Sequence, residues 1–154
     1  MRALIPALMT SLLFAIGCQS GYDNAYEAET RRLENELAWQ TEQARKYVAI
    51  VLFAVNSDVI DETGAREIEW FLEQIAPYPM AQIGVKGYTD STGSEAQNAP
   101  LSNQRAWAVQ DYLVSRGITP ERVTASGYSA SDPARTNTSS KGREQNRRAE
   151  IRVY

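Results

Sequence analysis

The sequence predicts an α+β fold, a two-layer α/β sandwich in which helices cover one face of a mixed sheet. Two observations support this prediction. Apolar, β-prone runs alternate along the chain with segments whose apolar residues recur at helical spacing, in the order βαβαβ(α)β. The chain has 154 residues, of which 43% are hydrophobic and 23% charged, a composition that suits one domain with a sizeable core.

The first strand and helix of this pattern are expected between residues 47 and 76. Residues 47–55 form a near-continuous β-prone run, as expected of a central strand. Residues 61–76 fit a helix in which Ile68, Phe71 and Ile75 lie on one apolar stripe. Two prolines that follow directly predict the end of this helix.

The rest of the predicted domain contains three more strands, one long helix and one helical turn. Residues 82–88 form the second strand, and residues 100–116 form a helix with Asn98 as its N-cap and Gly117 as its stop. The remaining elements are a strand at 123–128, a helical turn at 142–147 and an alternating closing strand at 149–154.

The N-terminal segment has the pattern of an export signal. Arg2 is the only charge before Asp23, and residues 1–17 are mostly apolar and end in small residues. The stretch Ala15-Ile16-Gly17-Cys18 resembles a bacterial lipobox, which implies that Cys18 carries palmitate-type acyl chains and begins the mature chain. Gln19 after it favours the outer membrane by the same resemblance. The alternatives are a buried helix for residues 1–17 and a free buried thiol.

Residues 18–46 are predicted to be the lipidated cysteine followed by a helical or flexible spacer. Helix-forming Glu, Ala, Arg and Gln dominate this stretch, and Glu27 and Arg31 have the favourable i,i+4 spacing. The domain organisation is therefore a signal peptide at 1–17, the spacer at 18–46 and one domain at 47–154.

The composition excludes several classes of function. The chain has no histidine, which excludes Ser-His-Asp and Cys-His catalysis and any histidine-ligated metal site. It has one cysteine, so an intrachain disulfide is impossible. The net charge of −3 and the export signal argue against nucleic acid as a partner. No cofactor is predicted.

Three polar clusters stand out against the predicted scaffold. They are Gly87-Tyr88-Thr89-Asp90-Ser91-Thr92-Gly93, Asn98-x-x-Leu101-Ser102-x-x-Arg105 and Ser140-x-Gly142-Arg143-x-x-Asn146-Arg147-Arg148. A strand–loop–helix unit can bring Asp90 and Arg105 together across a shallow pocket. The carboxylate and the guanidinium would then take the ammonium and carboxylate of one zwitterionic centre. A plain structural salt bridge between the two is the alternative.

Together these clusters resemble the OmpA-like peptidoglycan-binding domain of Pal-like lipoproteins, over essentially all of residues 47–154. The resemblance implies that Asp90 takes the amino group and Arg105 the carboxylate at the free end of diaminopimelate in the peptide stem. It implies further ligand contacts at Asn98, Thr89 and Arg147, and it places Asn56 at the border of the pocket. The sequence departs from the family after Phe53, where an aspartate is common and alanine stands here.

The predicted function is that of a non-enzymatic tether, with acyl chains in the outer membrane and a periplasmic domain that grips peptidoglycan. An accessory component of an envelope machine, either Tol–Pal-like or one for secretion or motility, would use the same grip with another protein partner. A carboxylate-based cell-wall hydrolase is a remote alternative, because it needs one acid kept protonated beside an ionised one. A basic neighbour would lower the pKa of Asp90 instead of raising it.

Overall fold

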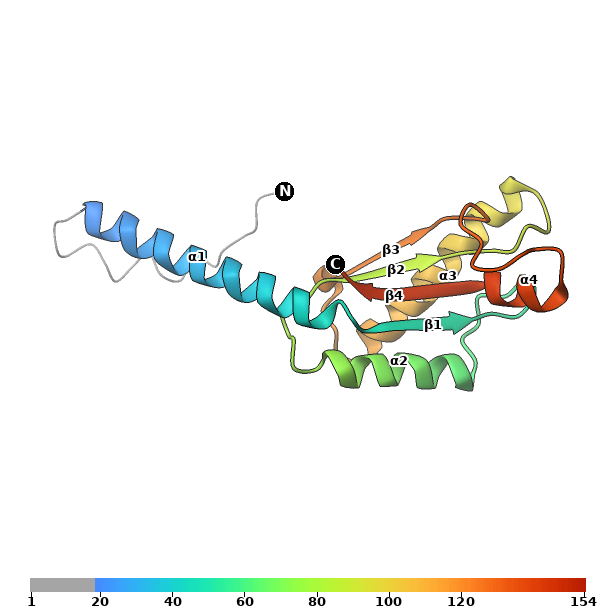
Figure 1. Ribbon diagram of the computed structural model, residues 1–154, viewed down its shortest axis with the longest axis horizontal. Coiled ribbons are helices and arrows are strands. Elements are labelled where there is room, and N and C mark those ends of the chain that lie inside the picture. Colours follow the sequence, from blue (N-terminus) through green and yellow to red (C-terminus); the bar gives the residue numbers. More distant parts are fainter. Residues whose placement is uncertain (1–18) are drawn as a thin grey trace. The chain divides into compact units, whose positions relative to one another are not determined.

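A computed structural model of the protein (Figure 1) describes residues 19–154. The chain divides into two compact units, one that ends at Glu36 and one that spans Leu37–Tyr154. The predicted signal at 1–17 and the predicted lipidation site Cys18 lie outside the described residues. The elements are α1 (Gln19–Ala44), β1 (Val48–Leu52), α2 (Glu62–Ile75), β2 (Ile83–Gly87), α3 (Glu95–Ser115), a 3₁₀ turn η2 (Pro120–Arg122), β3 (Val123–Gly127), α4 (Ser140–Asn146) and β4 (Arg148–Val153).

The four strands form one mixed sheet in the order β1-β4-β2-β3. β4 runs antiparallel to both of its neighbours, whereas β2 and β3 are parallel. α2 packs against β1 and α3 packs against β2 and β3, so that both helices lie on one face of the sheet (Figure 1). The predicted α+β sandwich with helices on one face of a mixed sheet is confirmed.

The prediction that the first strand is central is wrong. β1 lies at an edge of the sheet, and its residues alternate between buried and exposed positions. Ala49 and Val51 face the helices, while Ile50 and Leu52 are 46% and 41% exposed on the open face. A continuous apolar run normally marks a strand buried on both faces, but here only one face is covered by helices.

The core lies between the sheet and the two long helices. The apolar stripe of α2 is confirmed, since Ile68, Phe71 and Ile75 are all buried there. Asp61 caps α2, because its side chain accepts a hydrogen bond from the Gly64 amide at 2.7 Å. Burial of three large apolar side chains at roughly 1.5–3 kcal/mol each holds this helix against β1.

α3 begins earlier than the sequence predicts. It starts at Glu95 instead of Pro100, because Ser94 and Gln97 form a capping box. Pro100 is therefore inside the helix, where it removes one backbone hydrogen bond. Asn98 is not the N-cap; it lies in the first turn of α3, is buried, and donates from its amide to the Thr92 carbonyl at 3.0 Å.

The last turns of α1 belong to the same compact unit as the sheet, which spans Leu37–Tyr154. Ala44 is fully buried in the core, and Gln40 is buried and accepts a hydrogen bond from the Met80 amide at 2.9 Å. The domain therefore includes about ten residues that the sequence analysis assigned to the spacer. Among the described residues, no helix combines the length and apolarity needed to cross a membrane.

Candidate ligand-binding site

A pair of glycines lets α3 lie directly on the sheet beside the site. Gly87 of β2 and Gly127 of β3 are register partners. A Cβ atom on Gly87 would lie 2.0 Å from the Ser102 carbonyl oxygen, and one on Gly127 would lie 2.4 Å from the Asn103 amide nitrogen. Only glycine permits this approach. It brings the N-terminal half of α3, which carries Asn98 and Arg105, to the end of β2.

Arg105 is fully buried, and backbone carbonyl groups surround its guanidinium. Nε donates to the Ser57 carbonyl at 2.9 Å, Nη1 to the Tyr88 carbonyl at 2.8 Å and Nη2 to the Ala54 carbonyl at 3.2 Å. The guanidinium also lies 5.2 Å from the ring centroid of Phe53. These contacts fix the position and orientation of the positive charge.

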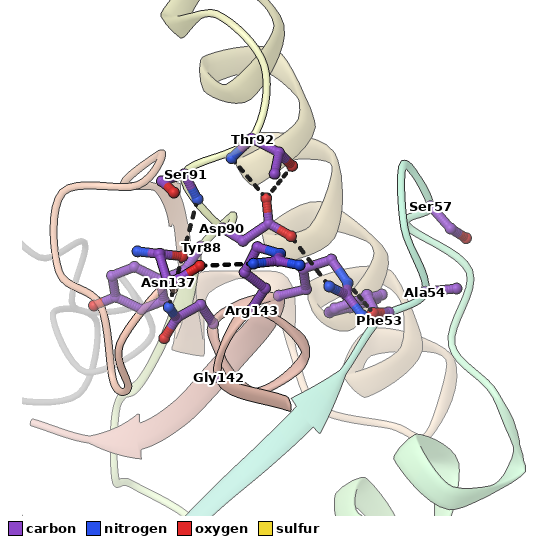
Figure 2. A network of polar contacts seen from close by, with 12 residues as sticks. Phe53, Ala54, Ser57, Tyr88, Asp90, Ser91, Thr92, Asn137, Gly142 and Arg143 are labelled. Carbon is purple, nitrogen blue, oxygen red and sulfur yellow. Dashed lines mark hydrogen bonds and ion pairs between the residues drawn. The ribbon is translucent and has the colours of Figure 1, made fainter. Parts of the chain in front are cut away.

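The turn after β1 wraps around this guanidinium. Asn56 in the turn adopts φ of 53°, a left-handed conformation that asparagine tolerates better than most residues. The turn therefore directs the carbonyl groups of Ala54 and Ser57 at Arg105. Figure 2 shows Phe53, Ala54 and Ser57 along this segment, beside the loop that carries Asp90.

Asp90 lies three residues beyond the end of β2 and is almost completely buried. Thr92 donates to Oδ1 of Asp90 from its amide nitrogen at 2.9 Å and from its hydroxyl (Figure 2). Arg147 Nη1 pairs with Oδ2 at 3.1 Å. Burial raises the pKa of Asp90, but the Thr92 hydrogen bonds and Arg147 outweigh it and leave the pKa below its ordinary value. Asp90 is therefore an ionised carboxylate at neutral pH.

Asp90 and Arg105 do not form the structural salt bridge that was the alternative interpretation. The ion-pair partner of Asp90 is Arg147, which also donates from Nε to the Phe53 carbonyl at 3.1 Å. Burial and the neighbouring Arg147 lower the pKa of Arg105 to about 10, against the opposing effect of Asp90 and Asp58. Arg105 thus remains positive at neutral pH, and it lies close enough to Asp90 for that carboxylate to raise its pKa.

These groups line one cavity of about 210 Å³. All six residues predicted from the sequence lie on it: Asn56, Thr89, Asp90, Asn98, Arg105 and Arg147. Five further residues complete the lining, and the sequence analysis assigned none of them to the site: Val55, Thr92, Gly93, Gln97 and Leu101. Thr92 and Gly93 stand in the first polar cluster, so the spacing around Asp90 contained a signal for them.

The cavity retains hydrogen-bonding capacity for a ligand. Among the described residues, the buried hydroxyl oxygen of Thr89 has no hydrogen-bond partner. Arg105 uses three of the roughly five N–H donors of a guanidinium in its hydrogen bonds to carbonyls. Asp90 accepts three hydrogen bonds, whereas an ionised carboxylate offers about four acceptor positions. A ligand with both an ammonium and a carboxylate group would find partners for each.

A second layer of contacts holds the loops around the cavity, and the sequence analysis assigned it no role. Asn137 accepts from the Ser91 amide at 3.1 Å, and Arg143 Nη1 donates to the Asn137 carbonyl at 2.8 Å (Figure 2). Fully buried Asn146 donates to Asn137 Oδ1 at 2.9 Å and bonds to both backbone groups of Arg135. Asn146 stands directly before Arg147 and thereby links the site to the loop of residues 128–139 between β3 and α4.

The comparison of the sequence with protein families identifies these elements. The OmpA family matches residues 52–147, which include both the end of β1 and Arg147. The chain belongs to the OmpA family. The six predicted residues and the glycine pair all lie within the matched range, and the resemblance that the three polar clusters indicated is confirmed.

This chain matches only part of the length of its individual relatives. "Peptidoglycan-binding protein ArfA" of Mycobacterium bovis is 43% identical over 81 residues, which are 53% of this chain and 25% of ArfA. "Probable lipoprotein YiaD" of Escherichia coli is 35% identical over 101 residues, 66% of this chain and 46% of YiaD. The chain therefore spans less than half the length of these two relatives.

A solved structure has the same fold. The peptidoglycan-associated lipoprotein of Burkholderia pseudomallei superposes with a TM-score of 0.65 over 69% of this chain and 90% of that one, at 23% identity. Within the described residues of this OmpA-like domain, no group of His, Cys, Asp and Glu side chains has the arrangement of a metal site.

Proposed function

We propose that this OmpA-like chain binds peptidoglycan without covalent bonds, through the free zwitterionic end of diaminopimelate in the peptide stem. The observation that carries this proposal is the cavity in which an ionised carboxylate and a fixed guanidinium face a common space. The name of the relative ArfA, a peptidoglycan-binding protein, supports the same substrate class.

Each predicted residue receives a role that its surroundings allow. Asp90 takes the ligand ammonium at its remaining acceptor position, and Arg105 takes the ligand carboxylate with its remaining N–H groups. Thr89 offers the unpartnered hydroxyl, and Asn98 and Asn56 contact the rest of the diamino acid. Arg147 keeps Asp90 ionised and adds a second positive charge for the ligand carboxylate.

The charges of the cavity favour binding over hydrolysis. Among the described residues, Asp90 is the only carboxylate on the cavity lining, and its pKa is lowered, opposite to the raised pKa that a general acid requires. Glu95, a second carboxylate close to Asp90 in the sequence, is exposed and does not line the cavity. It accepts a hydrogen bond from the Ser129 hydroxyl at 2.7 Å. A non-enzymatic grip is therefore the proposed activity.

The proposed tether also includes the membrane anchor. Cys18 after the apolar N-terminal run is the proposed lipidation site, and acyl chains there would hold the periplasmic domain at the outer membrane. The name of YiaD as a lipoprotein supports this part. Cys18→Ser should abolish metabolic labelling with palmitate, whereas a labelled serine variant would contradict the anchor.

Co-sedimentation with insoluble peptidoglycan tests the proposed grip. Asp90→Asn keeps the shape of the side chain but removes the charge that the ammonium needs. A charge-assisted hydrogen bond contributes about 1.5–3 kcal/mol, so the affinity should fall about 10- to 100-fold. Glu95→Gln removes a carboxylate at the start of α3, outside the cavity lining, and should bind like wild type. Equal binding of the two variants would refute the site, and release of soluble muropeptides would refute the non-enzymatic role.

A further inference from the structure

The two edges of the sheet differ in a way that the proposed peptidoglycan binding does not explain. β3 forms one edge and contains Thr124 and Ser126, with the Tyr154 hydroxyl donating to Thr124 at 2.8 Å. β1 forms the other edge, and all five of its residues are aliphatic. Sheet edges normally carry charged residues, proline or a bulge that blocks pairing with another chain. β1 has none of these features, and in the described part of the chain no strand pairs with its outer side.

The order of residues in β1 makes this edge complementary to itself. In an antiparallel pair that turns about Ile50, Val48 of one copy faces Leu52 of the other, and Ala49 faces Val51. Directly opposite residues share a face of the sheet. Val48, Ile50 and Leu52 would therefore meet their counterparts on the open face, where Ile50 and Leu52 are 46% and 41% exposed. Ala49 and Val51 would extend the helix-covered face.

The surface beside β1 is hollow and carries both signs of charge. A groove of about 490 Å³ runs along Val48, Ile50 and Leu52, with Glu67 and Arg135 among its lining residues. A second copy that approaches this edge therefore meets an apolar floor and opposite charges at the rim, not a field of one sign. Aliphatic cross-strand pairs are the contacts that stabilise such an edge.

We propose that β1 pairs with β1 of a second copy of this chain, antiparallel about Ile50, to form one continuous eight-stranded sheet. The interface is isologous, because the same five residues serve both copies. A five-residue edge buries less surface than the roughly 1,200–2,000 Å² of a standard stable interface, so the dimer is concentration-dependent. Confinement to a surface would favour it, and two ligand cavities in one assembly would bind a polymer with avidity.

Disulfide trapping tests both the partner and the register. In the Cys18→Ser chain, which lacks the native thiol, Ile50→Cys puts two thiols on the two-fold axis. Opposed residues of an antiparallel pair have Cα atoms about 4.5–5.5 Å apart, inside the range that a disulfide spans. Mild oxidation should therefore cross-link this variant efficiently. Thr124→Cys, exposed on the opposite edge, is the matched control and should remain mostly monomeric.

Sedimentation equilibrium of the Cys18→Ser chain supplies a measurement free of cross-linking. The chain should show a monomer–dimer equilibrium that Ile50→Lys weakens at least about tenfold, since two lysines would face each other at the axis. Ile50 is half-exposed, so this variant should keep the wild-type circular dichroism spectrum. A chain that stays monomeric at high concentration, or equal cross-linking at positions 50 and 124, would overturn the proposal.

Discussion

The close packing of α3 on the sheet at Gly87 yields a quantitative prediction. In Gly87→Ala the new Cβ would lie 2.0 Å from the Ser102 carbonyl oxygen and 3.0 Å from the Ala106 amide nitrogen, and both are backbone atoms. Ordinary contact begins at 3.4 Å, so α3 must move away from β2 by about 1.4 Å. Overpacking of this kind costs about 1–3 kcal/mol or more. The same movement shifts Arg105 relative to Asp90. The affinity for peptidoglycan should therefore fall even under conditions in which the variant is fully folded.

Gly84→Ala on the same strand is the matched control. Its nearest neighbour is a ring carbon of Tyr154 at 3.0 Å, and this side chain is 54% exposed and able to move. Urea unfolding should therefore place Gly84→Ala close to wild type and Gly87→Ala at least about 1 kcal/mol below it. Co-sedimentation with peptidoglycan at a temperature where both variants are folded completes the assay. If Gly87→Ala matched Gly84→Ala in both measurements, the claim that glycine is required for this approach would be wrong.

Three further predictions concern the charges and hydrogen bonds around the cavity. Arg105→Met leaves three carbonyl groups without their donor and should lower the free energy of unfolding by at least about 3 kcal/mol in urea; a loss under 1 kcal/mol would contradict the buried cage. Asn146→Ala removes three hydrogen bonds from a fully buried position and should cost about 2–3 kcal/mol, against little change for exposed Glu144→Ala. Because the folded pKa of Asp90 lies below its ordinary 3.8, its contribution to stability is complete above that pH and is lost as pH falls through the lower folded value. A urea series against pH should show this loss in wild type and not in Asp90→Asn.

The sequence was sufficient to predict a mixed sheet, the helices on one of its faces and six of the residues that line the cavity. Hydrophobic spacing located α2 within about one residue at either end, because its buried stripe repeats over almost four turns. The polar clusters contained five of the six predicted residues, and the resemblance to the OmpA-like domain selected these five and added Asn56. Neither result required knowledge of long-range contacts.

Other features depended on contacts between distant segments. The apolar run of β1 suggested a central strand, but strand order is set by pairing across the chain, and β4 lies between β1 and β2. The partner of Asp90 is Arg147, which is 57 positions away, and the nearer Arg105 instead binds carbonyl groups from two loops. Pro100 was a strong but misleading signal for the start of α3, since the capping box at Ser94 outweighed it.

Titration of the isotope-labelled protein with a soluble muropeptide that carries diaminopimelate tests the central claim most directly. Amide resonances of the residues around Asp90 and Arg105 should shift together and saturate. The same muropeptide with its free diaminopimelate amino group acetylated should leave them in place, because it can no longer pair with the carboxylate. Shifts confined to another surface, or equal shifts with the acetylated ligand, would contradict recognition of the zwitterionic end in this cavity.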